Sequence, residues 1–390
     1  MTQPAETTPV PQDQSTAKLM ASVLVMRIVM DTSNKLFFPY LSVIAAGLGT
    51  TTVELGKLLS WRDLASLVSP FLGATADKRG YRRVISACLA ASGTGLLTIY
   101  FSQSTTGFLI GIMLAAFGGA GAGPNIVAYL SHRLPWNKRS RGLGIIEYAW
   151  GLASIIGVSA SGFLIAATSW RMPFLIIGCL AFVFAFVYLR FPPAGRETSD
   201  THTHNEAGQL SITERVREFL DLGPNRRSAW FTLIGDSLTR FAGFLLFINF
   251  GTWLDDQFDL GAAGIAAAVF WLGFSDIAGS VSVSVLGDRI GKRNSVIGGT
   301  ILGAFFFTLL PFWAGGLVII VIGIFVARAC FEFSIVSYLV LASEQSPEHR
   351  GKMMTMRVAF SLVSSFSSAR FGPQLYEAFD VPGFAWPAAV

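Results

Sequence analysis

Ionisable side chains lie inside segments that are otherwise apolar, and some of them are spaced so that they can act together. Three pairs stand four residues apart: Arg27 with Asp31, Asp236 with Arg240, and Arg328 with Glu332. In a helix this spacing puts both members of a pair on one face, where opposite charges neutralise each other. A charge at the centre of a bilayer costs at least roughly 2.5–3.5 kcal/mol unless it is paired or wet. We therefore expect these pairs to face a polar seam.

Two of the pairs are related to each other by position. Asp236 follows Arg27 by 209 positions and Arg240 follows Asp31 by 209, so the same pair recurs with its signs reversed. Such pairs can also bridge a central cavity, and one interpretation is a charge network that rearranges while one carboxylate takes up a proton. The alternative is a static set of pairs that only makes burial of the charges tolerable.

Acidic residues without a basic neighbour on their own helix are better candidates for a proton site. Asp276 is such a residue in the middle of an apolar segment, and Glu147 in "GIIEYAWGLASIIG" is similar, with Trp150 nearby. Arg357 aligns within one position of Glu147 in the repeat and is a candidate partner. A structural role is the alternative for each acid. The proton-coupling candidates are Asp31, Glu147, Asp276 and Glu332.

A cavity for cargo would collect the remaining polar and charged side chains of the apolar segments. The expected cavity residues are Arg27, Asn34, Asn125, Trp150, Asp236, Arg240, Asn249, Arg328 and Arg357. The aromatic residues Trp150, Phe247, Trp253, Trp271 and Phe331 are candidates for an apolar pocket, although aromatic residues in membrane proteins more often pack or lie at the interface. No Ser/His/Asp, Cys/His or metal-ligand pattern occurs, so we expect neither an enzyme nor a bound cofactor, only a proton gradient as the driving force.

The elements that position these residues are long apolar segments. The chain has 390 residues, of which 52% are hydrophobic, and its mean hydropathy is +0.55. A bilayer core about 30 Å thick requires roughly 20 apolar residues in a helix. Eleven segments have about that length: 20–47, 55–76, 84–101, 108–130, 143–168, 172–191, 229–254, 262–286, 295–313, 316–341 and 353–375. A twelfth begins at "GFAWPAAV", so the sequence predicts an all-α membrane protein with eleven complete spans and a stub of the twelfth.

Loop charges indicate the orientation. Nearly all Lys and Arg of the loops fall on the side of the N-terminus, whereas the other side holds Arg171 and the acidic "DDQFD". The positive-inside rule then predicts a cytoplasmic N-terminus in the plasma (inner) membrane. We expect residues 1–18 to form a disordered tail, 19–191 and 228–390 to form two helical bundles, and 192–227 to link them. Spans 3, 6 and 9 carry no charge and should face lipid.

The chain contains an internal repeat. "GATADKRGYRR" (73–83) is matched by "SVLGDRIGKRN" (284–294), with Asp77 on Asp288 and Gly80 on Gly291 at an offset of 211. "PWNKRSRGLG" matches "SPEHRGKM" with Arg141 on Arg350, and Pro173 matches Pro387. Three matches at nearly one offset predict a duplicated six-span unit.

At these residues the chain resembles transporters of the major facilitator superfamily. Gly73, Asp77, Lys78, Gly80, Arg82 and Arg83 fit the loop signature between spans 2 and 3, and Ser284 replaces the first glycine in the second copy. The resemblance implies two six-helix halves related by a pseudo-two-fold axis, with helices 3, 6, 9 and 12 at the periphery. It also implies a conformational latch, which we place at Gly73, Asp77, Arg79, Gly80, Arg83, Asp288, Arg289 and Gly291. The alternative is a solvated loop that only sets orientation.

One position in span 4 bears on the branch of the superfamily. Proton-coupled exporters usually carry an arginine four residues before a glycine in span 4, where this chain has Leu114 before Gly118. We expect a secondary transporter that exports a small organic solute in exchange for protons, in the manner of the drug and metabolite efflux branch. The alternatives are uptake of a polar solute such as a sugar or organic acid, and a non-transporting scaffold or receptor. The expected partners are a small-molecule substrate and membrane lipid, without nucleic acid, for a monomer.

Overall fold

The computed structural model describes residues 14–134, 146, 148–191, 221–222, 225–313, 315–345 and 350–389, which are helical apart from short connections. The first half contains α1 (Gln14–Lys35), α2 (Leu41–Leu48), α3 (Thr52–Ser66), α4 (Ser69–Arg79), α5 (Tyr81–Phe101), α6 (Thr105–Arg133), α8 (Ala149–Leu152), the π-helix η1 (Ala153–Val158), α9 (Ser159–Ala167) and α10 (Met172–Arg190). The second half contains α12 (Arg226–Phe258), α13 (Gly261–Ile290), α14 (Lys292–Leu309), the 3₁₀ turn η2 (Leu310–Phe312), α15 (Leu317–Gln345) and α16 (Arg350–Ala389).

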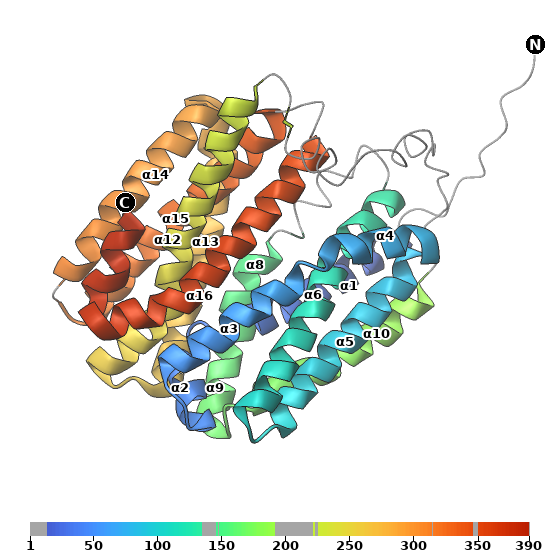
Figure 1. The fold of residues 1–390 in the computed structure, drawn as a ribbon, viewed down its shortest axis with the longest axis horizontal. Coiled ribbons are helices and arrows are strands. Elements are labelled where there is room, and N and C mark those ends of the chain that lie inside the picture. Colours follow the sequence, from blue (N-terminus) through green and yellow to red (C-terminus); the bar gives the residue numbers. More distant parts are fainter. Residues whose placement is uncertain are drawn as a thin grey trace, which may run out of the picture.

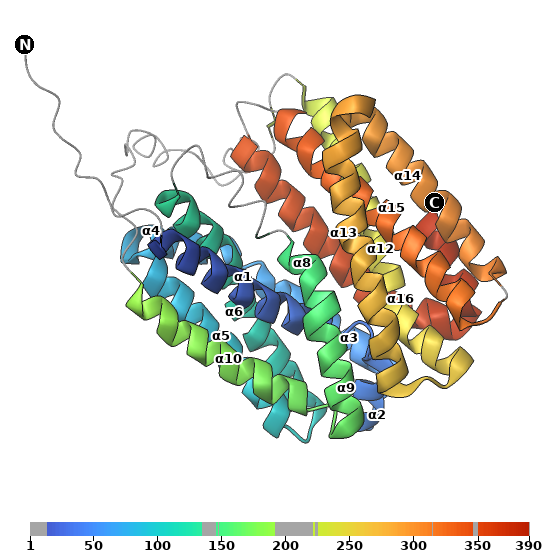
Figure 2. The same cartoon turned by 180° about the vertical axis from the view of Figure 1, so that it is seen from behind.

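The two halves lie side by side as separate bundles (Figures 1 and 2). We call the end that carries Arg79, Arg133, Arg190 and Arg289 the basic end, and the end that carries Gly49, Phe101, Asp259 and Phe312 the far end. Among the described residues, eight helices are long and apolar enough to cross a membrane. The other expected spans, 20–47, 55–76 and 353–375, are helical but broken or more polar, so the count of eleven stays a prediction.

Breaks in the helices follow from local sequence. Residues 36–40 form a turn between α1 and α2, and Pro70 stands in the first turn of α4, where its missing N–H costs nothing. Within α16, Asp380 has φ 53° and ψ −145°, so the segment is two helices joined by a sharp bend. Its last turn lies beside α12, α14 and α15.

The repeated loop has the same backbone conformation in both halves. Gly80 between α4 and α5 has φ 91° and ψ 133°, and Gly291 between α13 and α14 has φ 85° and ψ 143°. Only glycine adopts this region without strain. Both copies of the repeated loop therefore contain the same glycine turn, 211 residues apart.

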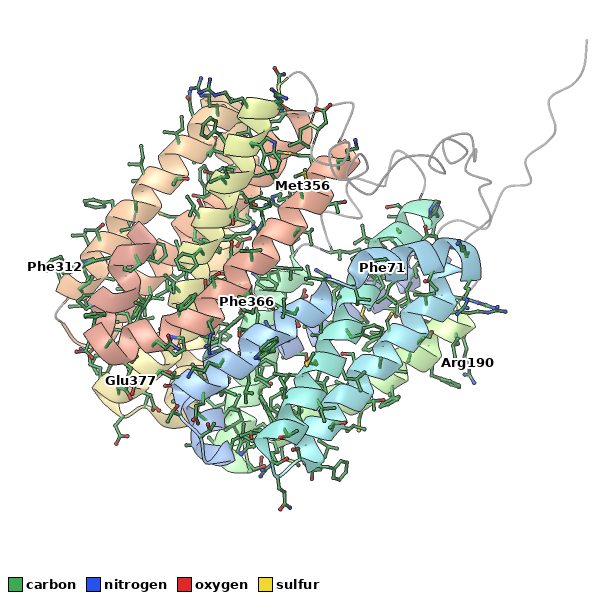
Figure 3. The ribbon with its side chains drawn as sticks, viewed as in Figure 1. Phe71, Arg190, Phe312, Met356, Phe366 and Glu377 are labelled. Atoms are coloured by element: carbon green, nitrogen blue, oxygen red, sulfur yellow. The ribbon has the colours of Figure 1, made fainter. Side chains whose placement is uncertain are left out.

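The charge-free spans lie at the periphery. Helices α5 and α10 form one edge of the molecule and α14 the opposite edge (Figures 1 and 2), and each packs within its own half. Outer faces carry large apolar side chains: Phe312, just after α14, is 66% exposed at the outer edge in Figure 3, and Phe186 of α10 is 55% exposed. Lipid accepts such surfaces, whereas water does not.

Contact between the halves is concentrated from the middle to the far end. Helix α3 packs on α16, α9 and η1 pack on α13, and α2 packs on α12. Glycines permit the closest approaches: Gly251 lies against the Pro39 backbone, Gly56 against the Ala369 carbonyl, and Gly162 of α9 against Ala266 and Tyr40. At the basic end, α4 packs on α5 and α6 of its own half.

Candidate functional site

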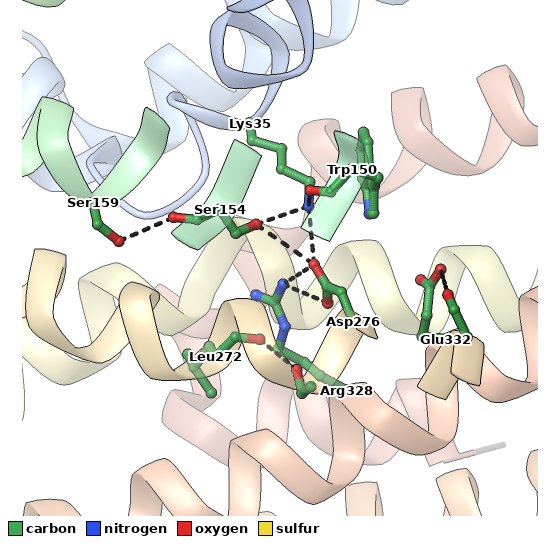
Figure 4. A network of polar contacts seen from close by, with 10 residues as sticks. Lys35, Trp150, Ser154, Ser159, Leu272, Asp276, Arg328 and Glu332 are labelled. Atoms are coloured by element: carbon green, nitrogen blue, oxygen red, sulfur yellow. Dashed lines mark hydrogen bonds and ion pairs between the residues drawn. The ribbon is translucent and has the colours of Figure 1, made fainter. Parts of the chain in front are cut away.

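The centre of the seam between the halves is Lys35, the last residue of α1. Its Nζ donates to the Trp150 carbonyl at 2.8 Å, to Ser154 Oγ at 2.8 Å and to Asp276 Oδ2 at 2.9 Å (Figure 4). The same ammonium lies 3.8 Å from the centre of the Trp150 ring, close enough for a cation–π interaction. Each of the three donor hydrogens of the lysine therefore has an acceptor.

Asp276 of α13 holds two cations from different halves. Besides Lys35, it accepts from Arg328 Nη2 at 2.8 Å (Oδ1) and 3.0 Å (Oδ2). Only 2% of Asp276 and 5% each of Lys35 and Arg328 are exposed. Breaking a pair this deeply buried leaves an uncompensated charge, so the three groups hold one another in place. We call Lys35, Asp276 and Arg328 the seam triad.

Aromatic rings surround the cationic side of the triad. The Arg328 guanidinium lies 4.4 Å from the Phe247 ring centre and 5.8 Å from that of Phe250. A small cavity next to the triad is lined by Lys35, Phe38, Pro39, Ser154, Val158, Phe247, Phe250, Val269 and Arg328. This lining combines two cations and three phenylalanines with no carboxylate.

The π-helix η1 brings Ser154 to the triad. Ser154 Oγ lies 2.8 Å from Lys35 Nζ and 3.5 Å from Asp276 Oδ2, while its carbonyl accepts from Ser159 Oγ at 3.0 Å. π-Helical turns are rare and occur frequently at functional sites because they re-aim side chains within a helix. Ser154 therefore links the first half directly to Asp276.

The expected i, i+4 pairs are confirmed in two of three cases. Arg27 and Asp31 form an ion pair at 3.5 Å, and Arg240 and Asp236 form one at 3.0 Å. The third pairing is wrong, because Arg328 turns to Asp276 while Glu332 Oε1 accepts from Ser280 at 3.2 Å. Arg328 makes two charge-assisted hydrogen bonds with Asp276, at 2.8 and 3.0 Å.

Asp236 forms a second buried network within the second half. Arg357 Nε lies 3.1 Å from Asp236 Oδ2, and its Nη2 donates to Asp236 Oδ1 and to the Ile335 carbonyl. The expected partner of Arg357 was Glu147, a residue outside the described part of the chain. Arg357 thus pairs with Asp236, whose exposed fraction is 1%, and its expected pairing with Glu147 stays a prediction.

Asp276 also differs from its expected setting. It has no basic neighbour on its own helix, but two cations reach it from α1 and α15. Asp276 therefore lacks a basic neighbour along its own helix but has two cationic partners in the fold. Its role in proton coupling, like that of Asp31, Glu147 and Glu332, stays a prediction.

The expected cavity residues occupy different environments. Asn125 Nδ2 donates to the Gly121 carbonyl at 2.7 Å and Asn249 Nδ2 to the Leu245 carbonyl at 2.9 Å, both within their own helices. Asn34 lines a small cavity beside Arg27 and Asp31. Of the aromatic candidates, Trp150 lies at the triad. Phe247 and Phe331 meet edge to face with their ring centres 5.3 Å apart, and Trp271, which is 61% exposed, lines an apolar cavity between α13 and α15.

The latch residues lie at the basic end. Arg79, Arg83 and Arg289 are exposed, and the space around Gly73 and around both turn glycines, Gly80 and Gly291, is open. The side chains of Asp77 and Asp288 lie outside the described part of the structure. The latch therefore stays a prediction.

Lys35 was not among the site residues expected from the sequence. Lys35 follows Asp31 by four residues, which favours a local pair, whereas its partner Asp276 lies 241 residues away. Ser154 carries no charge and gave no signal. Among the described residues, no cluster of three His, Cys, Asp or Glu side chains could hold a metal ion.

Comparison with known proteins agrees with this arrangement. The family model of the Major Facilitator Superfamily matches residues 23–274 and 232–390. The chain is 25% identical over 362 residues to the uncharacterized MFS-type transporter YwfA of Bacillus subtilis (strain 168), covering 91% of this chain and 85% of that protein. It is 24% identical over 155 residues to the bacillibactin exporter of the same organism, 38% of each chain.

Among solved structures, a bacterial homolog of the human lysosomal transporter Spinster, in an inward-facing and unoccupied conformation, has the same fold. The TM-score is 0.73 at 16% identity, covering 94% of this chain and 84% of that one. The fold of the described residues, the internal repeat and the family match over residues 23–274 and 232–390 agree with one another. This multi-pass membrane protein is a transporter rather than an enzyme, and it belongs to the Major Facilitator Superfamily.

Proposed function

We propose that this transporter moves a small organic solute by alternating access, in the direction of export and in exchange for protons. The observation that carries the proposal is the seam triad, in which Lys35 of the first half and Arg328 of the second share Asp276. A contact of this kind between the halves has to break whenever the seam opens toward the far end. Its strength therefore controls the transport cycle.

The contacts between the halves support one assignment of the present conformation. Packing of α2 on α12 and of α9 on α13 closes the far end, and Ser42 Oγ donates to Asp255 Oδ2 at 3.1 Å there. With a cytoplasmic N-terminus in the plasma membrane, the basic end is the inner one. The state described here then corresponds to access from the inside, with the outer gate closed.

A proton on Asp276 would weaken its hold on Lys35. A neutral carboxyl keeps hydrogen bonds but loses the charge attraction that offsets burial of both cations. A proton would then bind at the seam from the outside, and the solute would bind at the same seam from the inside. Because the two bind alternately, they are exchanged, which is antiport. The export direction is supported by the likeness to the bacillibactin exporter.

The test is transport by the purified full chain in proteoliposomes that contain a pH-sensitive dye. We expect some member of a panel of labelled sugars, amino acids, aromatic acids and aromatic amines to move against an opposing proton flux. Asp276→Asn should abolish the coupled proton flux, whereas Lys292→Gln, which removes an exposed lysine paired with Glu344, should leave it unchanged.

Other results would contradict the proposal in separable ways. Solute and protons moving in the same direction would indicate uptake. A rate of solute transport that does not depend on the pH gradient would indicate facilitated passage. Binding of a solute that never crosses the membrane would indicate a scaffold or receptor of the same fold.

A further inference from the structure

We propose that the transported solute is an organic monoanion, whose carboxylate binds between Lys35 and Arg328 while an aromatic or apolar body packs against Phe38, Phe247 and Phe250. This inference rests on the proposed transport function and names the class of its cargo. It is argued from charge, from an unused hydrogen-bond donor and from the lining of the cavity beside the triad.

The seam triad carries an excess of positive charge. Two buried cations share the one carboxylate of Asp276, so the contact as a whole is left at +1. Glu332 is the next acidic group, but its Oε1 is directed to Ser280 Oγ at 3.2 Å rather than to either cation, as Figure 4 shows. A buried excess charge favours a counter-ion. A solute that supplies one negative charge therefore completes the site, and a cationic solute is repelled from it.

Arg328 also has one N–H donor that makes no hydrogen bond with the described residues. Its Nη2 serves both oxygens of Asp276, while its Nε, buried in a side chain that is 5% exposed, has no hydrogen-bond partner among the described residues. An unsatisfied buried donor costs free energy, and a guanidinium binds a carboxylate best through two adjacent N–H groups. A solute carboxylate that accepts from Nε satisfies this donor.

The cavity lining selects the rest of the solute. Phe38, Phe247 and Phe250 face the same small cavity as Lys35 and Arg328, and none of the described residues that line it is a carboxylate. In the present state this cavity has room for little more than a water molecule. Cargo can enter only when Asp276 gives up one of its cations. Asp276 thus acts as an internal competitor that occupies the position of the solute carboxylate.

The experiment uses the purified full chain in detergent and three solutes of one shape: 3-phenylpropionate, 3-phenylpropionamide and 3-phenylpropylamine. We expect the acid alone to raise the melting temperature in a dose-dependent way. Lys35→Gln and Arg328→Gln should each weaken its binding at least about tenfold, the usual effect of losing a hydrogen bond to a charged group. Asp276→Asn should bind the acid more tightly than the unaltered chain, because the competitor is removed. Lys292→Gln is the matched control with unchanged affinity.

Folding of each variant is checked by gel filtration, and Lys35→Arg, which keeps the charge, should retain binding if Lys35→Gln does not fold. Equal binding of the acid and the amide, tighter binding of the amine, or weaker binding to Asp276→Asn would each overturn the proposal. So would the absence of binding by any member of a series of aromatic and aliphatic monocarboxylates.

The two proposals fail separately: flux of a neutral or cationic solute in proteoliposomes removes the substrate class only. Acid binding without flux of any solute removes the transport function only.

Discussion

At the scale of single residues, the seam triad is asymmetric, because one anion serves two cations. Removal of Asp276 leaves both Lys35 and Arg328 buried without a counter-charge, whereas removal of Lys35 leaves Asp276 with Arg328 still bound at 2.8 Å. Truncating one partner of a buried ion pair costs roughly 3–5 kcal/mol when it leaves a charge uncompensated. The triad therefore tolerates loss of its lysine better than loss of its aspartate.

We expect Asp276→Asn to lower stability by roughly 3–5 kcal/mol and Lys35→Gln to lower it by clearly less. The measurement is thermal unfolding in detergent, followed by tryptophan fluorescence and by recovery of the monodisperse gel-filtration peak. Lys292→Gln should change stability by no more than about 1 kcal/mol, since its pair is exposed. A larger loss from Lys35→Gln than from Asp276→Asn would refute this order.

The sequence identified Asp276 and Arg328 of the triad but not their partners. Arg328 and Asp276 were recognised because charges in apolar spans are costly, and the pairs Arg27–Asp31 and Asp236–Arg240 were recognised because they are local. Arg328 was assigned to Glu332 on the same helix, since i, i+4 spacing can be read from one segment. Its real partner lies on another helix, a relation that spacing along one helix does not contain.

At the scale of elements, the two glycine turns are the clearest product of the duplication. Gly80 and Gly291 have positive φ and nearly equal ψ, although the residues before them differ. The sequence pointed to both positions because the two glycines match in the internal repeat, and a glycine at matching positions suits a backbone conformation that only glycine adopts without strain. The break of α16 at Asp380 falls between the expected span 353–375 and the expected twelfth span that begins at Gly383, so the sequence predicted a break there but not the residue that bends.

We expect Gly80→Ala and Gly291→Ala each to cost about 1–3 kcal/mol, because a side chain forces strain at these φ values. Gly73→Ala is the control, since Gly73 is helical and no atom lies within 4 Å of an added Cβ. The measurement is the melting temperature of each of the three variants in detergent, compared with that of the unaltered chain. Turn variants as stable as Gly73→Ala would mean that the backbone relaxes there without strain.

At the scale of the whole molecule, closure of the far end is the feature that the transport cycle has to reverse. Ser42 and Asp255, from different halves, are joined by a hydrogen bond of 3.1 Å. Helix existence and the two-bundle plan were predictable from hydropathy and repeats. The conformational state was not, because it depends on contacts such as Gly251 against Pro39, which join residues more than 200 positions apart.

We expect Ser42→Cys combined with Asp255→Cys, in a chain whose Cys88, Cys179 and Cys330 are replaced by serine, to form a disulfide under mild oxidation. The cross-link should stop transport in proteoliposomes, and a reducing agent should restore it, because the far end can then open again. Each single variant, treated in the same way, serves as the control. Transport that continues with the cross-link fully formed would show that the far end does not open during the cycle.

The π-helix η1 has a geometric consequence for the helix that contains it. Ser154 faces Lys35 and Asp276, and Gly162, eight residues later, faces Tyr40 and Ala266. Eight residues of α-helix rotate through two turns plus roughly 80°, which would put these contacts on different sides. The wider winding from Ala153 to Val158 absorbs about one residue of rotation, so both residues point the same way. One surplus residue thereby aligns a polar contact and a close-packed one along a single face.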